Sequence, residues 1–148
     1  MEKLRLISIY FFLFLNFATY TQSNELKEKD FDIESLILNS TSLSQIMVNI
    51  NFSFEQHGEK RKSENGTLIT VRYENNSLIT PLVTYTLQGE VSQIIFLMPR
   101  NNVDLIGKEL IKKYGTKVIN SNEIIQRGSL TYDIRYDEDG EIGILIIK

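Results

Sequence analysis

Alternation of apolar and polar residues with a period of two runs through most of the chain after residue 48, and it limits the fold more than any other feature. In an extended chain this period places successive side chains on opposite faces, so each such run predicts a strand with one buried face. The segment at 56–66 lacks the alternation and is expected to be a polar loop. The predicted strands are residues 48–55, 67–74, 78–87 and 91–98, two short extended pieces at 117–120 and 123–126, and a hairpin of 129–136 with 141–147.

Two stretches have helical periodicity instead. The first follows Asp32, whose side chain can accept hydrogen bonds from the free amides of a first turn. The second follows Pro99, with Asn101 or Asn102 as its cap and Gly115 at its end. The apolar positions are Ile33, Leu36, Ile37, Leu43 and Met47 in the first stretch, and Ile106, Leu110, Ile111 and Tyr114 in the second.

The order of helix, four strands, helix and further strands predicts an α+β fold. We expect an antiparallel or mixed sheet of about six strands with two helices packed on one face, formed by residues 32–148 as a single domain. Pro81 lacks an amide hydrogen, so the third strand should meet a sheet edge or a bulge there. Residues 141–147 end in a segment that is apolar on both faces, so that strand should lie inside the sheet.

The first 22 residues have the layout of a secretory signal peptide. Lys3 and Arg5 precede the apolar run 6–18, and small polar residues follow it. A membrane-spanning helix needs about 20 apolar residues, so this run is short for an anchor, although an uncleaved anchor stays the alternative. We expect residues 1–22 to be removed, residues 23–31 to form a flexible leader, and the mature protein to be periplasmic or secreted without stable membrane insertion.

Composition excludes several kinds of chemistry. The 148 residues include no cysteine, so there are no disulfides, thiolate metal ligands or cysteine nucleophile. The formal net charge of −3 does not provide the positive field on which nucleic-acid binding depends. We therefore expect no nucleic-acid partner, no metal and no cofactor, and a fold stabilised by packing alone.

Six residues are the candidates for binding. The basic triplet in the predicted loop at 56–66 could contact a phosphate or an acidic partner, although neighbouring glutamates offset its charge. The acidic residues lie in or before the turn at 137–140, whose spacing does not match a calcium loop because Arg135 and Ile146 occupy two of the ligand positions. The candidates are Lys60, Arg61 and Lys62 in the basic group, and Asp133, Asp137 and Asp139 in the acidic group.

The sequence favours a small exported noncatalytic binding domain, such as an inhibitor, an adaptor or an envelope-associated module. It would bind another protein through an exposed strand edge or through the sheet face that the helices leave uncovered. One alternative is a small secreted hydrolase that uses the carboxylates of Asp133, Asp137, Asp139 and Glu141. Another is a carrier of an apolar ligand in a pocket between sheet and helix.

Overall fold

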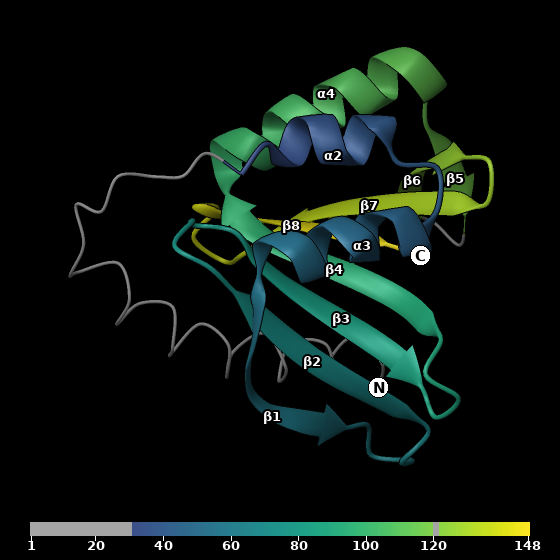
Figure 1. Ribbon diagram of the computed structural model, residues 1–148. Helices are drawn as coiled ribbons and strands as arrows, with labels where there is room; N and C mark the ends of the chain where they lie inside the picture. The colour runs from purple at the N-terminus through teal and green to yellow at the C-terminus, as the bar shows by residue number, and fades with distance from the viewer. Residues whose placement is uncertain (1–30, 120–121) are drawn as a thin grey trace.

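The computed structural model describes residues 31–119 and 122–148 and shows an α+β fold (Figure 1). The predicted signal peptide, and the predicted leader apart from Phe31, lie outside the described residues. In the described part, three helices accompany one antiparallel sheet of eight strands, in the order β1-β2-β3-β4-β8-β7-β6-β5. The predicted fold class is confirmed, whereas six strands and two helices were too few.

Each helix and strand has the following bounds. The helices are α2 (Ile33–Asn39), α3 (Leu43–Ser53) and α4 (Arg100–Tyr114). The strands are β1 (Glu55–Lys62), β2 (Leu68–Glu74), β3 (Thr80–Thr86), β4 (Val91–Pro99), β5 (Lys117–Ile119), β6 (Asn122–Arg127), β7 (Leu130–Tyr136) and β8 (Ile142–Ile147). None of the three helices has the length and hydropathy needed to cross a bilayer.

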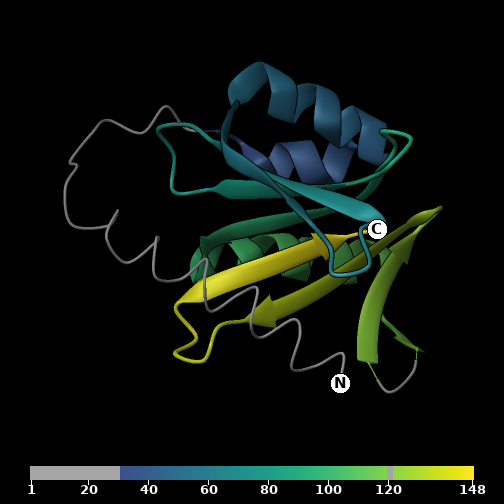
Figure 2. The same ribbon diagram turned by 90° about the horizontal axis from the view of Figure 1, so that it is seen from below.

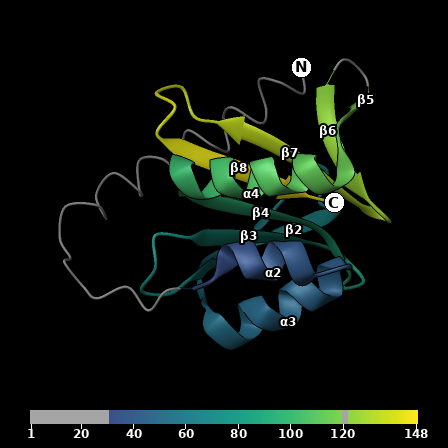
Figure 3. The same ribbon diagram turned by 90° about the horizontal axis from the view of Figure 1, so that it is seen from above.

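The main hydrophobic core lies between the helices and one face of the sheet. Seen from above, α4 lies in front of β8 and β4, and α2 and α3 lie together to one side of it (Figure 3). Every strand from β2 to β4 and from β6 to β8 contributes side chains to this core, which is therefore continuous across the sheet. Its fully buried members include Ile37, Ile46, Ile50, Ile94, Phe96, Ile106, Leu110, Tyr132 and Leu145.

The first helical stretch is divided into two helices. Asp32 caps α2 as predicted, because its Oδ1 accepts a hydrogen bond from the Ser35 amide at 2.9 Å. The helix ends at Asn39, and Ser42 then begins α3 by accepting from the Gln45 amide at 3.3 Å. Serine side chains of this kind favour caps over helix interiors, which explains the break.

The prediction of a strand at 48–55 is wrong, because α3 continues to Ser53. Ile46, Met47 and Ile50 are buried, whereas Val48 and Phe52 are 67% and 92% exposed. The alternating pattern and the helical pattern coexist over these residues, and burial follows the helical one.

The prediction of a loop at 56–66 is also wrong over most of its length. Residues 55–62 form the edge strand β1, and all eight are exposed. Since neither face is buried, the strand has no apolar alternation that could reveal it. Its pairing with β2 is interrupted between His57 and Arg61, near Gly58 with a φ of 74°.

Pro81 lies in an interior strand, at the end where the sequence predicted a sheet edge or a bulge. Strand β3 runs between β2 and β4, and Pro81 pairs with Phe96 of β4. The ladder between β2 and β3 stops at the pair Arg72–Leu82, so the missing amide hydrogen falls where β2 no longer pairs. The expectation that 141–147 lies inside the sheet is confirmed, because β8 runs between β4 and β7.

Helix α4 follows Pro99 as predicted, but it begins at Arg100 without a side-chain cap from either asparagine. Its end at Gly115 is confirmed, since the Gly115 amide donates to the Ile111 carbonyl at 2.8 Å and its φ is 69°. The buried stripe is Val103, Ile106, Gly107 and Leu110, so Ile111 and Tyr114 were wrongly included in it.

The strand order is symmetric about the centre of the sheet. In each half a helix precedes four consecutive antiparallel strands, α3 with β1–β4 and α4 with β5–β8. The last strands of the two halves, β4 and β8, lie side by side in the middle, with six residue pairs from Ile94–Ile147 to Pro99–Ile142 (Figure 2).

Candidate binding face

The side of the sheet opposite α2, α3 and α4, here called the helix-free face, carries a second apolar cluster. Cross-strand pairing aligns Leu82 with Ile95, Ile95 with Ile146, and Leu97 with Ile144. These five side chains are each no more than 8% exposed, although none of the described helices lies on this side. The central strands are thus apolar on both faces.

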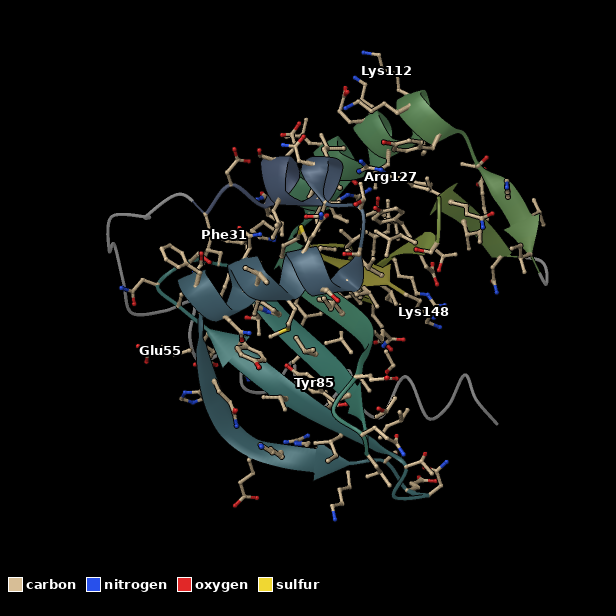
Figure 4. The ribbon with its side chains drawn as sticks, turned by 45° about the vertical axis from the view of Figure 1, so that its right-hand side comes forward. Phe31, Glu55, Tyr85, Lys112, Arg127 and Lys148 are labelled. Carbon is tan, nitrogen blue, oxygen red and sulfur yellow. The ribbon has the colours of Figure 1, made fainter. Side chains whose placement is uncertain are left out.

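A groove of about 1120 Å³ lies on the helix-free face. Its floor is formed by side chains of β2, β3, β4 and β8, and β1 forms a wall. Glu55 at the start of β1 and Lys148 directly after β8, both labelled in Figure 4, line it. The floor includes Thr70, Arg72, Leu82, Thr84, Gln93, Ile95 and Ile146.

Uncharged polar groups cross the middle of the floor. Thr70 and Thr84 pair across β2 and β3, and their hydroxyl oxygens are 3.1 Å apart. The Ser92 hydroxyl donates to the Thr84 carbonyl at 3.1 Å. The neighbouring Gln93 side chain makes no hydrogen bond with the described residues, which leaves its amide available to a ligand.

The charged groups of the floor centre on Arg72. Its Nη2 lies 2.5 Å from Oε1 of Glu74, and the other oxygen of that carboxylate lies 3.3 Å from Nδ1 of His57. The Arg72 Nε is buried and has no hydrogen-bond partner in the described part of the chain. An unpaired buried donor costs about 1–3 kcal/mol, so this enclosed nitrogen lowers the stability of the fold locally.

The structure separates the predicted site residues. Arg61 and Lys62 line the groove from β1, whereas Lys60 does not. On the far side of the helix-free face, the Asp133 carboxylate forms an ion pair with Arg135 at 2.6 Å, and Arg135 also lines the groove.

The other two acidic candidates belong to the turn between β7 and β8. The Asp137 Oδ1 accepts a hydrogen bond from the Ile142 amide at 2.9 Å, which closes the hairpin. Asp139 is exposed in the same turn. No group of three or more histidines and carboxylates within 31–119 and 122–148 is placed to hold a metal ion.

Sequence reasoning missed Arg72 and Gln93. Arg72 lies between Val71 and Tyr73, both of which face the core, so strict alternation does place it on the opposite face. What the sequence lacks is a signal that this face is hollow, because that depends on the curvature of the sheet and on the position of β1.

The groups with clearly shifted pKa values lie on the helix side. Burial, and then the hydrogen bond with Tyr73, raise the pKa of Tyr85, whose hydroxyl oxygen is 2.9 Å from that of Tyr73. Burial raises the pKa of Tyr132, and the 2.6 Å hydrogen bond to Asp104 raises the pKa of Tyr136. These tyrosines belong to the core and to its rim, and none lines the groove.

Comparison of the chain with protein-family models, curated proteins and solved structures finds no match. The case for a function therefore depends on the groove and its residues.

Proposed function

We propose that the protein is an exported noncatalytic binding domain, periplasmic or secreted, that binds another protein through the groove on the helix-free face. The observation that supports this most is a groove whose floor holds the Gln93 amide, without a hydrogen-bond partner among the described residues, and the partly exposed guanidinium of Arg72. The predicted signal peptide supports export.

The free edges of the sheet are less suited to binding. Strand β1 is charged along its length and has a register shift, which are features that protect an edge from pairing with other chains. At the opposite edge, β5 has only three residues. Of the two surfaces that the sequence suggested, the structure therefore favours the sheet face.

The two alternative functions receive less support. Asp133 pairs with Arg135 and Asp137 holds the hairpin turn, so both carboxylates already have structural partners. An apolar-ligand carrier would need an apolar cavity between sheet and helices, whereas the hollow of about 800 Å³ between α4 and the strands β6 and β7 is bordered by the charged residues Asp104, Lys108, Lys112 and Glu123.

The test is affinity capture from the exported fraction of the source cells, with two matched variants of the full chain. Gln93→Arg places a large charged group in the groove, whereas Gln88→Arg makes the same change in the exposed turn between β3 and β4. We expect Gln93→Arg to lose the captured protein and Gln88→Arg to retain it. Equal retention by both variants would refute binding through the groove.

A further inference from the structure

We infer that the groove accepts a polypeptide segment in extended conformation, with a main-chain carbonyl of that segment hydrogen-bonded to the Arg72 guanidinium. This inference rests on the proposed function and specifies the form in which the partner is bound. It is drawn from the size of the groove, the chemistry of its lining and two polar side chains on its floor, Arg72 and Gln93.

Size and lining argue against a small apolar ligand. Pockets for such ligands occupy about 300–1,000 Å³ and are mostly hydrophobic and aromatic. This groove is larger, at about 1120 Å³, and the aliphatic residues among its described lining are only Leu68, Leu82, Ile95 and Ile146. Leu82 and Ile146 are 3% and 4% exposed, so they offer a lipid chain little surface.

The lining also lacks what a nucleic acid requires. Single strands bind through aromatic side chains that stack on the bases and through a continuous positive surface. Among the described lining residues the one aromatic ring is the imidazole of His57, and there is no Phe, Tyr or Trp, because Tyr73, Tyr85 and Phe96 face the helices. Glu55, Glu59 and Glu74 are interspersed among the basic residues of the lining, which interrupts the positive surface.

A peptide backbone matches the remaining groups. The Arg72 Nε is enclosed, but the guanidinium carries further N–H donors, and the neighbouring carboxylate of Glu74 already balances its charge. The Arg72 side chain is 21% exposed, so a ligand can reach its guanidinium from the groove. The Gln93 amide can both donate and accept, as main-chain recognition requires. A neutral carbonyl is thus better suited to this floor than a second carboxylate.

The test begins with selection of a phage-displayed library of random heptapeptides on the full-length protein. The strongest peptide is then synthesised with a fluorescein label, and its affinity is measured by fluorescence anisotropy. Arg72→Lys retains the charge but removes the planar guanidinium with its Nη donors, and we expect about tenfold weaker binding from the loss of a charge-assisted hydrogen bond. Gln93→Leu should weaken binding as well, and it keeps the test decisive if Arg72→Lys does not fold.

Arg100→Lys is the matched control, since it makes the same change at the start of α4, outside the groove. Equal effects of Arg72→Lys and Arg100→Lys would overturn the inference. So would a selection that yields no peptide, or tighter binding of oleate or of a thymidine oligonucleotide than of any selected peptide. If no peptide binds but capture still depends on Gln93, the partner presents a folded surface, and the proposed function stands without this inference.

Discussion

The hydroxyl groups of Tyr73 and Tyr85 form a hydrogen bond with each other between the sheet and α3. The oxygens of Tyr73 and Tyr85 are 2.9 Å apart, and the Tyr85 hydroxyl lies 3.5 Å from Sδ of Met47. Tyr85→Phe leaves the Tyr73 hydroxyl with no partner of its own, so we expect it to lower the free energy of unfolding by about 1–2 kcal/mol. Urea denaturation measures the change. Tyr114→Phe removes a hydroxyl that has no hydrogen-bond partner in 31–119 or 122–148, and an equal loss in that variant would contradict the argument.

The raised pKa of Tyr85 predicts how stability changes at high pH. The unfolded chain begins to lose this proton near the ordinary tyrosine pKa of 10.0, whereas the folded protein still holds it. The unfolded state therefore binds fewer protons above pH 10, and the free energy of unfolding decreases as pH rises. We expect urea midpoints to fall between pH 9.5 and 11 by this linkage, and to fall less steeply in Tyr85→Phe. Parallel curves for the two proteins would refute the assignment.

At the scale of elements, the contact between α4 and β8 depends on the absence of a side chain at Gly143. A β-carbon at this position would clash with the side chain of Val103, which projects from α4 onto β8. We expect Gly143→Ala to lower the free energy of unfolding by about 1–3 kcal/mol or more, as overpacking does. In the background of Val103→Ala, the added methyl group should cost less. A double-mutant cycle by urea denaturation measures this coupling, and purely additive effects would contradict the proposed contact.

A helix or strand could be predicted from the sequence where its apolar residues repeat along the chain with one clear period. Strands β2, β4, β7 and β8 have alternating or continuous apolar residues and were located within a few residues. The segment of α3 satisfied two periods at once, because Ile50 and Phe54 fit both, and local sequence does not decide between them. Strand β1 has neither the helical nor the alternating period. None of its residues is buried, and it is held in place by its pairing with β2.

The candidate site was less predictable than the fold because it belongs to the whole molecule. Arg61 and Lys62 were identified from their charge, but their role depends on β1 forming the wall of a groove over β2, β3 and β4. Arg72 and Gln93 lie on the same face of the sheet only because β3 joins their strands, β2 and β4. Such a site has no local signature, since its floor and wall arise from five strands whose residues are separated in the chain.

The two halves of the molecule share one core, and this predicts that they unfold together. Buried residues of the first half, such as Ile50 and Val83, belong to the same cluster as Leu110 and Tyr132 of the second half. The ladder between β4 and β8 joins the halves along six residue pairs. Separating them would expose the apolar surface of both, so neither half has a core of its own to retain.

The natural absence of cysteine makes this cooperativity measurable. Asn76→Cys and Glu138→Cys place single thiols in exposed turns of the first and second halves, where an environment-sensitive dye disturbs little. We expect the two dyes to report the same urea midpoint, as a two-state transition requires. Phe96→Ala, in the central strand β4, should lower both midpoints equally, with a loss of about 3–5 kcal/mol. Separate midpoints, or a shift confined to the Asn76→Cys reporter, would show instead that the symmetric topology is also a division into independent units.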